Sequence, residues 1–246
     1  MLSDKQIPIK ERLIFALDVP TVEEARILVK KLGDSIQFYK LGLEIFMAGG
    51  YYETIEWLTK AGKKVFVDLK FFDVPNTVAS AVRKLTEYKP TFASVHGNDS
   101  ILEAACKEKG EIQILAVTVL TSLDQSDIKA LGFGKDMGFV EDMKIEDLVY
   151  SRAERALKLG CDGVISSGME VRRLRDGLGQ GITIVVPGIR PVKNTDDQKR
   201  TVDVEEAFAN GADYIVVGRP IKEAVDPKKA AEDIQERIAK IPFRSK

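Results

Sequence analysis

The sequence is poor in the two residue types that most often bind metals or form cross-links. Its 246 residues include two cysteines, Cys106 and Cys161, and one histidine, His96. The cysteines lack the close spacing of a metal-binding motif, so we expect neither a disulfide framework nor a Cys/His zinc site. This cysteine usage is typical of a reducing compartment and predicts a cytoplasmic protein without a bound metal.

Blocks of like charge and long apolar segments are also missing. The 37 basic and 38 acidic residues give a net charge of −1, and their even spread offers no charged surface for nucleic acid or an anionic membrane. The longest apolar stretch covers residues 114–120, far below the ~18 residues that span a bilayer. Residues 1–12 are too polar for a signal peptide. We therefore expect no nucleic-acid or membrane partner.

The composition is that of a globular protein with a sizeable core. Hydrophobic residues make up 44% of the chain and charged residues 30%, both ordinary values. The length is compatible with one large domain. Because no linker or low-complexity segment divides the chain, we expect a single domain over residues 1–246, with a short polar extension at residues 1–11.

Strand and helix patterns alternate along the whole chain. Short β-branched runs predict strands at 12–18, 36–42, 64–70, 91–96, 112–119, 163–167, 182–187 and 214–218. Segments of helical period predict helices at 22–32, 51–61, 76–87, 100–108, 147–159, 169–177, 203–210 and 227–239. Thr21 with Glu24, and Asp203 with Glu206, have capping-box spacing. Glycines that favour a left-handed helix end stand at positions 33, 62, 110, 160 and 211.

This alternation predicts the α/β class, with parallel strands closed into a single (β/α)₈ TIM barrel. A doubly wound sheet is the rival fold, but it normally has a glycine-rich turn after the first strand. That turn here reads DVPTVEEA and contains no glycine. The longest irregular stretches, residues 121–145 and 189–201, follow the fifth and seventh strands. We expect functional residues in both because barrel enzymes place their sites at these strand ends.

Charged side chains gather at the carboxyl ends of the predicted strands. In the third strand, Asp68 and Lys70 are in phase with Phe66, whereas Val65, Val67 and Leu69 point the other way. The three apolar residues should face the helices, which directs the two charges to the barrel mouth. By the same reasoning Asp18 and Lys40 point inward at the ends of the first two strands. Four charges in so small a space must be paired to be tolerated, and together they form a fixed field.

Two nearby polar residues have simpler interpretations. Asp73 follows the third strand and adds a fifth charge, but it precedes Pro75 at a helix start, where an acid often serves only as a cap. His96 ends the fourth strand, and without a partner for a catalytic triad it is interpreted as a hydrogen-bonded residue of the rim.

A second polar site is predicted after the last two strands. Gly188 and Arg190 follow the seventh strand, and Gly218 and Arg219 follow the eighth. Barrels often bind phosphate between these two loops, where glycine lets backbone N–H groups approach the oxygens. Arginine adds charge-assisted hydrogen bonds. The combination predicts a small phosphorylated ligand.

The sequence also resembles a known family. Residues 68–77, DLKFFDVPNT, are similar to the D-x-K-x-x-D-I-P-N-T signature of orotidine 5′-phosphate decarboxylases, with Val74 in place of the usual isoleucine. Val186 stands where a threonine often precedes the P-G-I-R-P motif. The likeness extends over essentially the whole chain, through ALD at 16–18, YKLG at 39–42, LTS at 120–122, PGIRP at 187–191, DQ at 197–198 and VGRP at 217–220.

The resemblance implies a cofactor-free decarboxylase that converts orotidine 5′-phosphate to UMP. It implies that Lys70 donates the proton and that Lys40, Asp68 and Asp73 complete the catalytic array. It also implies a homodimer, in which Asp73 and Thr77 reach the neighbouring subunit's site. The implied substrate contacts are Asp18 and Lys40 at the ribose, Thr77 on the ribose-phosphate side, Thr121 and Ser122 at the pyrimidine, and Arg190, Gln198, Gly218 and Arg219 at the phosphate.

Three other functions are compatible with the residues. A keto-sugar-phosphate decarboxylase or epimerase would keep the D-x-K-x-x-D array and add Mg²⁺ near Asp68. A Schiff-base aldolase would use Lys70 or Lys40 as nucleophile, but it would need a lysine without carboxylate partners. A non-catalytic phosphate-binding barrel is possible because a fold does not determine a function, although it would leave the four inward charges unexplained.

Overall fold

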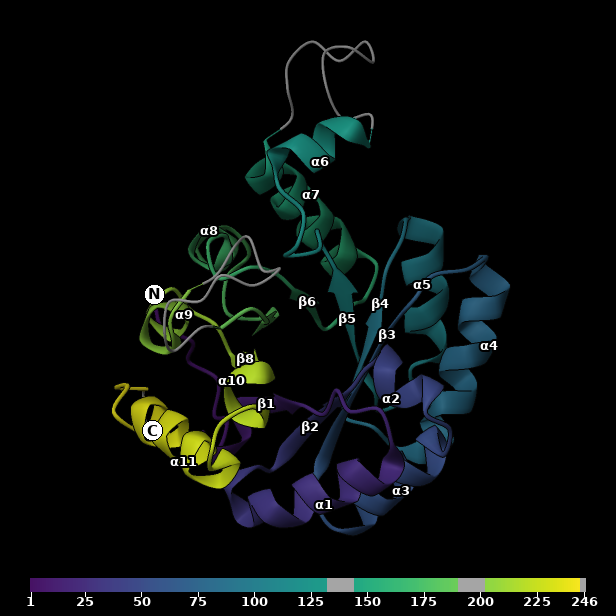
Figure 1. Cartoon of the computed structure of the whole chain (residues 1–246). Coiled ribbons are helices and arrows are strands. Elements are labelled where there is room, and N and C mark those ends of the chain that lie inside the picture. The colour runs from purple at the N-terminus through teal and green to yellow at the C-terminus, as the bar shows by residue number, and fades with distance from the viewer. Residues whose placement is uncertain (132–143, 190–201, 244–246) are drawn as a thin grey trace.

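Eight parallel strands lie at the centre of the molecule and are hydrogen-bonded in chain order (Figure 1). The last strand pairs with the first, which closes the barrel. The computed structural model describes residues 1–131, 144–189 and 202–243. The strands are β1 Leu13–Ala16, β2 Phe38–Leu41, β3 Lys64–Phe71, β4 Phe92–Val95, β5 Gln113–Val117, β6 Gly163–Ile165, β7 Thr183–Val186 and β8 Tyr214–Val217. Each lies within about two residues of its predicted range, so the predicted TIM barrel is confirmed.

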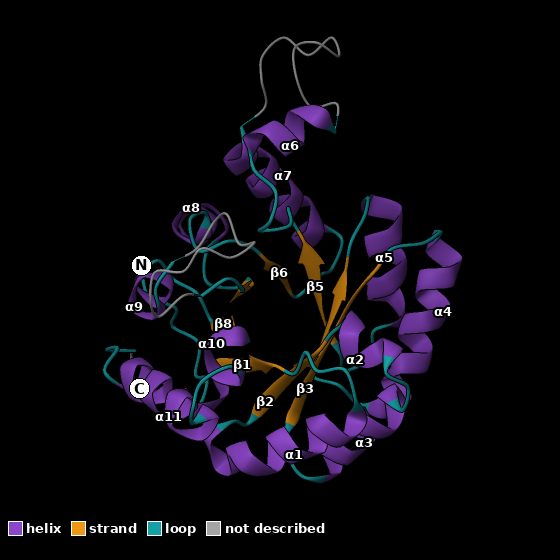
Figure 2. Ribbon diagram, in the orientation of Figure 1, coloured by secondary structure: helices purple, strands orange, loops and turns teal. Residues whose placement is uncertain are grey.

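A helix follows each strand and packs on the outside of the barrel (Figure 2). These helices are α1 Val22–Leu32, α3 Tyr51–Lys60, α4 Pro75–Leu85, α5 Asp99–Glu108, α7 Ile145–Lys158, α8 Val171–Leu178, α9 Val204–Ala209 and α11 Pro227–Ala239. The sequence patterns did not predict the short helices α2 Leu43–Met47, α6 Gln125–Ala130 and α10 Arg219–Lys222, nor the 3₁₀ turns Ile9–Glu11, Gly33–Ser35 and Thr86–Tyr88. Among the described residues, no helix is both long and apolar enough to cross a membrane.

The predicted helix ends are mostly correct. The Thr21 side chain accepts the backbone N–H of Glu24 at 3.1 Å, which is one half of the predicted capping box. The five predicted stop glycines all have positive φ. The capping box predicted at Asp203 is wrong, because this carboxylate accepts the N–H of Val204 and pairs with Arg237 instead. The stretch 121–145, predicted as irregular, contains α6, whose N-terminus has a capping box between Asp124 and Asp127.

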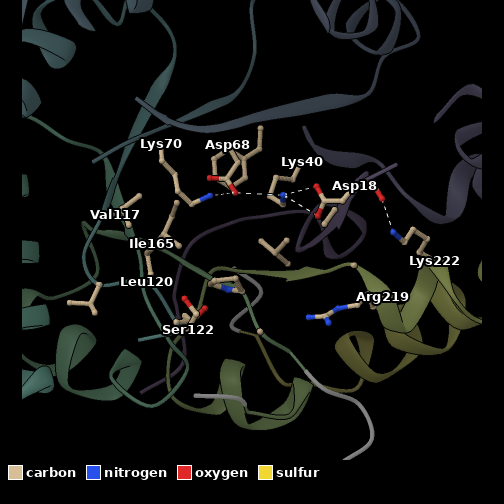
Figure 3. Close-up of a pocket in the computed structure, with 18 residues that line it drawn as sticks. Asp18, Lys40, Asp68, Lys70, Val117, Leu120, Ser122, Ile165, Arg219 and Lys222 are labelled. Atoms are coloured by element: carbon tan, nitrogen blue, oxygen red, sulfur yellow. Dashed lines mark hydrogen bonds and ion pairs between the residues drawn. The ribbon is translucent and has the colours of Figure 1, made fainter. Parts of the chain in front are cut away.

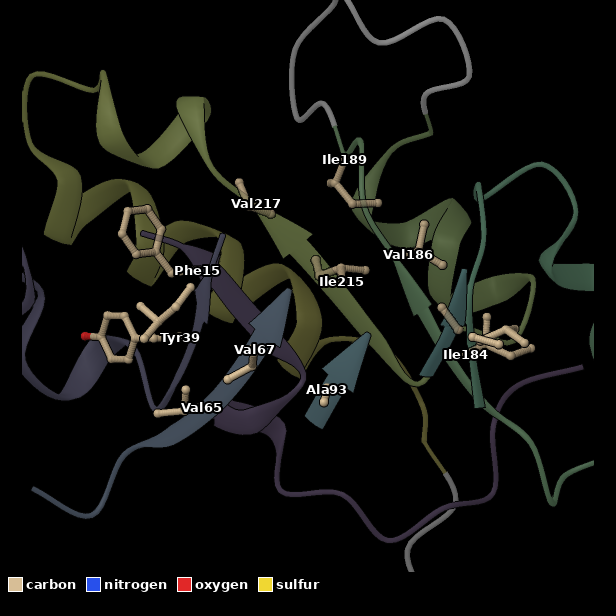
Figure 4. Packing of buried hydrophobic residues seen from close by; sticks show 14 of the residues in the cluster. Phe15, Tyr39, Val65, Val67, Ala93, Ile184, Val186, Ile189, Ile215 and Val217 are labelled. Carbon is tan, nitrogen blue, oxygen red and sulfur yellow. The ribbon is translucent and has the colours of Figure 1, made fainter. Parts of the chain in front are cut away.

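The strands separate two apolar layers. Ile14, Phe38, Phe66, Phe92 and Tyr214 fill the barrel interior. The alternate residues point outward and pack against the helices, among them Phe15, Tyr39, Val65, Val67, Ile184 and Val217 (Figure 4). This is the period-two division expected of β3, and it leaves the inner positions nearest the carboxyl ends of the strands for polar side chains.

A buried charge cluster lies at the opposite end of the barrel, beside the amino ends of β7 and β8. The Arg175 guanidinium lies 2.9 Å from the Asp213 carboxylate, and both side chains are fully buried. Asp213 also accepts the backbone N–H of Ile184 at 2.8 Å and a hydrogen bond from the Ser3 hydroxyl. Lys5 donates to the hydroxyl of Thr183 at 2.7 Å. The polar N-terminal extension is thereby fastened beneath the strands.

Candidate active site

A pocket of about 280 Å³ opens at the carboxyl ends of the strands. It combines the polar residues predicted for this face with an apolar floor (Figure 3). Its lining is Ala16, Asp18, Lys40, Phe66, Asp68, Lys70, Val117, Val119, Leu120, Thr121, Ser122, Ile165, Pro187, Gly188, Val216, Gly218, Arg219 and Lys222.

Four of these residues form one continuous chain of charges across β1, β2 and β3. The Nζ of Lys70 lies 3.0 Å from Oδ2 of Asp68, which lies 3.6 Å from the Nζ of Lys40. Lys40 lies 3.2 Å from Oδ1 of Asp18. The convergence predicted from strand phase is therefore confirmed for all four side chains. The charges alternate in sign, so each is balanced by its neighbours.

The backbone of β3 is irregular where it presents Lys70. The register between β3 and β4 shifts between Val67 and Phe71, and Lys70 has a φ of 50°. A left-handed conformation is uncommon for a residue with a side chain and is found most often where function requires it. This bend accompanies the placement of the Lys70 ammonium beside Asp68, two residues earlier on the same strand.

Ser94 of β4 holds this bend in place. Its hydroxyl accepts the backbone N–H of Lys70 at 2.9 Å and donates to Oδ1 of Asp68 at 2.8 Å. The residue is fully buried. Sequence analysis missed Ser94, although it is in phase with the inward-facing Phe92 and so had the same signal that identified Asp68.

Burial and charge act in opposite directions on the two innermost groups. Burial alone would lower the pKa of Lys40, but Asp68 and Asp18 outweigh it and raise that pKa above its ordinary value. Burial alone would raise the pKa of Asp68, but Lys40, Lys70 and the hydrogen bond from Ser94 outweigh it and lower that pKa. Both groups are therefore charged at neutral pH.

The opposite side of the pocket carries three of the residues predicted at the phosphate, Gly188, Gly218 and Arg219. Gly188, with a φ of 74°, and Gly218 follow β7 and β8. The Arg219 guanidinium lies across the pocket from Lys70 in Figure 3. Lys222, one helical turn after Arg219, also lines the pocket and donates to the backbone carbonyl of Asp18 at 2.7 Å. Lys222 was not predicted, although its spacing from Arg219 places both on one helix face.

The other predicted site residues divide into three groups. Thr121 and Ser122 line the pocket as predicted. Asp73 and Thr77 do not line it, since Asp73 is exposed and accepts the N–H of Val74 at 2.6 Å, while Thr77 borders a separate surface groove. Asp73 thus adds no fifth charge to its own chain's pocket. Arg190 and Gln198 lie outside the described residues.

His96 directly follows β4 and does not line the pocket, and the hydrogen bond expected of its side chain stays a prediction. It is half-buried, its ring packs edge-on against Phe72 at 5.3 Å between centroids, and it borders a neighbouring cavity. Burial, with smaller contributions from Arg152 and Lys70, lowers its pKa.

Comparison with known proteins identifies the family. Residues 11–234 match the model of the family described as "Orotidine 5'-phosphate decarboxylase / HUMPS family". The chain belongs to this family. The match includes all eight strands and every described residue that lines the pocket.

Relatives from the family are similar over nearly their full lengths. The chain is 56% identical over 239 residues to orotidine 5'-phosphate decarboxylase of Methylococcus capsulatus, covering 96% of each chain. It is 45% identical to that of Stenotrophomonas maltophilia, covering 97% of this chain and 98% of the relative. The solved structure of orotidine 5'-phosphate decarboxylase from Lactobacillus acidophilus is 33% identical, with a TM-score of 0.79 over 93% of this chain and 99% of that one.

Proposed function

We propose that this chain decarboxylates orotidine 5′-phosphate to UMP, a step of pyrimidine biosynthesis, without a cofactor. The observation that carries the proposal is the Lys70–Asp68–Lys40–Asp18 chain of charges, with Arg219 on the other side of the same pocket. One end of this site suits a reacting carboxylate and the other a phosphate. Family membership and nearly full-length relatives of that name support this assignment.

The pocket offers a contact for each part of the nucleotide. Asp18 and Lys40, at the β1 and β2 end of the charge chain, hold the ribose hydroxyls. The pyrimidine lies against Thr121 and Ser122, above the apolar side chains of the barrel. Gly218 and Arg219 bind the phosphate, together with Arg190 and Gln198, which we place here on family resemblance. A phosphate bound on the other side of the pocket from the reacting carbon can contribute to turnover as well as to binding.

The reaction needs a cation where negative charge develops. Breaking the bond between C6 and the carboxylate releases neutral CO₂ and leaves the electron pair on C6, in an orbital orthogonal to the ring π system. The Lys70 ammonium stabilises this carbanion and then transfers its proton to C6. Asp68, next to the departing carboxylate, favours its loss as a neutral molecule. The paired acids keep both lysines fixed before substrate arrives.

The proposal includes a homodimer in which Asp73 and Thr77 serve the neighbouring subunit's site. Asp73 lies two residues before α4 and Thr77 lies in its first turn, and neither lines the pocket of its own chain. Phe72 and Val74, which flank Asp73, are 67% and 62% exposed. Exposed apolar side chains around a charged residue suit a surface that is covered by another copy of the chain. We place the enzyme in the cytoplasm.

The pocket also bears on the alternative chemistries. A Schiff-base aldolase requires a neutral lysine, but Asp68 and Asp18 raise the pKa of Lys40, and Lys70 is paired with Asp68. A Mg²⁺-dependent keto-sugar-phosphate enzyme requires free carboxylate oxygens at Asp68. Those oxygens already accept the Ser94 hydroxyl and the Lys70 ammonium. Both arguments favour decarboxylation of orotidine 5′-phosphate over the aldolase and the Mg²⁺-dependent reactions.

An ultraviolet assay with orotidine 5′-phosphate tests the function, because substrate and product absorb differently. We expect full activity after exhaustive chelation with EDTA and no inactivation by borohydride in the presence of substrate. Activity that is lost to EDTA and recovered with Mg²⁺ would favour the keto-sugar branch. Trapping of substrate on a lysine by borohydride would favour the aldolase.

A further inference from the structure

The two cysteines, 55 positions apart in the sequence, meet on the outside of the barrel. Their Sγ atoms lie 3.4 Å from each other. Cys106 is in the last turn of α5, and Cys161 lies between α7 and β6. Cys161 is only 5% exposed, whereas Cys106 is partly accessible to solvent. Two thiols at this separation need to approach by little more than 1 Å to reach the ~2.05 Å of a disulfide bond.

A salt bridge holds the same two segments together. Lys109, which directly follows α5, lies 2.8 Å from the carboxylate of Asp162 and donates to the carbonyl of Gly160 at 2.8 Å. Asp162 in turn accepts the backbone N–H of Ile114 at 2.8 Å. The segment that carries Cys161 is therefore anchored on both sides of the cysteine. The fold therefore keeps the two segments that carry the thiols next to each other.

The two thiols differ in acidity. The contact between the two sulfurs lowers the pKa of Cys106, and the nearby Lys109 ammonium adds to this effect. The same contact raises the pKa of Cys161, and burial raises it further. Cys106 thus has the greater thiolate character and the greater access to solvent, which are the two properties that determine which cysteine an oxidant attacks.

We propose that Cys106 and Cys161 form an oxidation site for hydroperoxides. The Cys106 thiolate attacks one oxygen of the peroxide, which breaks the O–O bond, gives a sulfenic acid and releases hydroxide or alkoxide. The Cys161 sulfur then attacks the Cys106 sulfur, forms the S–S bond and releases water. Overall two thiols are oxidised and the peroxide is reduced to water or to water and an alcohol.

The disulfide would stabilise the barrel without blocking its pocket. Cys161 precedes β6 at the amino end of the strand, whereas the pocket lies at the carboxyl ends. The bond closes a loop of more than 50 residues, which restricts the unfolded chain more than the folded one. We therefore expect the oxidised protein to keep its activity in the decarboxylase assay and to have a Tm raised by at least about 3 °C.

The test is treatment of the full-length protein with a small excess of hydrogen peroxide, followed by peptide mass spectrometry without reduction. We expect a peptide pair linked through Cys106 and Cys161, an intact mass lower by two hydrogens, and reversal by dithiothreitol. Recovery of two free thiols, a sulfonic acid at Cys106 without the linked pair, or a disulfide between two chains would each overturn the proposal.

Two single variants test the order of the steps. In Cys161→Ser the Cys106 sulfenic acid has no thiol to react with, so dimedone should label Cys106. In Cys106→Ser the buried Cys161 should remain a free thiol under the same treatment, and neither variant should show the rise in Tm. Faster labelling at Cys161 than at Cys106 would contradict the proposed roles.

Discussion

Lys70 and Asp68 are joined twice. The ammonium of Lys70 lies 3.0 Å from Oδ2 of Asp68. A second connection runs through Ser94, which accepts the backbone N–H of Lys70 and donates to Oδ1 of Asp68. The ion pair orients the side chain and the serine fixes the left-handed backbone beneath it. The position of the cation in the pocket therefore depends on β4 as well as on β3.

Replacing Lys70 by alanine should abolish most of the activity and leave the fold intact. The lysine is the proposed proton donor and the nearest cation to the reacting carbon, so we expect kcat to fall by roughly 10³-fold or more. Lys64→Ala is the matched control. Lys64 is the first residue of the same strand, at the end away from the pocket, and it pairs with Glu11. Retention of most of the kcat by Lys70→Ala at an unchanged Tm would exclude the proposed role.

Ser94→Ala should lower kcat more than it changes KM. The variant leaves the backbone N–H of Lys70 and one oxygen of Asp68 without their buried partner, and losing a hydrogen bond to a charged group corresponds to roughly 10- to 100-fold in rate. Steady-state kinetics measures the two constants. Ser166→Ala is the control, since Ser166 is fully buried and its hydroxyl has no hydrogen-bond partner among the described residues. Equal effects of both substitutions on kcat would show that Ser94 acts only in packing.

Arg219→Ala should weaken use of the nucleotide and leave the phosphate-free nucleoside almost unaffected. The arginine follows β8, across the pocket from Lys70, where the phosphate is expected. We expect kcat/KM for orotidine 5′-phosphate to fall by roughly 10- to 100-fold, the contribution of a charge-assisted hydrogen bond. Kinetics with both substrates checks this, and an equal relative loss for the nucleoside would show that Arg219 does not bind the phosphate.

Mixing the inactive Lys40→Ala and Asp73→Ala variants should restore activity if each active site contains residues of both subunits. Lys40→Ala and Asp73→Ala homodimers each carry one lesion in every site. In a mixed dimer both lesions fall in one composite site, so the other site is wild type. Unfolding and refolding an equal mixture should recover about a quarter of the wild-type activity, because half of the dimers are mixed and one site in two is intact.

The same experiment separates a catalytic Asp73 from a helix cap. If Asp73 acts only within its own chain, every site of the mixed dimer keeps one lesion and no activity returns. Native mass spectrometry establishes that mixed dimers have formed. Inactive mixed dimers would refute the shared site while leaving the decarboxylase function in place.

The charge chain should make stability depend on pH in the acidic range. The pKa of Asp68 in the folded protein lies below its ordinary value of 3.8. The stability that ionised Asp68 contributes to the folded protein is therefore fully present above pH 3.8. It is lost as the pH falls through the folded pKa of Asp68. The difference in free energy of unfolding between wild type and Asp68→Asn should be constant between about pH 5 and 7 and shrink at lower pH. Urea unfolding across this range measures it, and a constant difference down to acid denaturation would contradict the pairing.

Period and spacing were sufficient to predict the barrel and most of the charged side chains in its pocket. The alternation of Val65 and Val67 with Phe66 and Asp68 assigned each face of β3, and the structure places these side chains as predicted. Glycine and arginine after the last strands identified the second side of the pocket. Such signals are local in sequence, so one chain is enough to detect them.

Contacts between distant segments were not predicted. Nothing near Ser94 in the sequence indicates that its hydroxyl bridges Lys70 and Asp68, because that depends on the register shift between β3 and β4. Lys222 reaches Asp18, 204 positions away in the chain, only because β8 and β1 are neighbours in the closed barrel. The absence of the predicted capping box between Asp203 and Glu206 has the same cause, since Arg237 of α11 competes for the Asp203 carboxylate.

The buried cluster beneath the barrel also bears on the order in which the chain folds during synthesis. The carboxylate of Asp213 balances the charge of the Arg175 guanidinium and also accepts a hydrogen bond from Ser3 near the N-terminus. A nascent chain that ends before Asp213 would bury an uncompensated cation, and β1 would have no β8 to pair with. We expect the barrel to close only once residues up to β8 have left the ribosome. Strand β1, which is synthesised first, therefore stays without its β8 partner until most of the chain has been made.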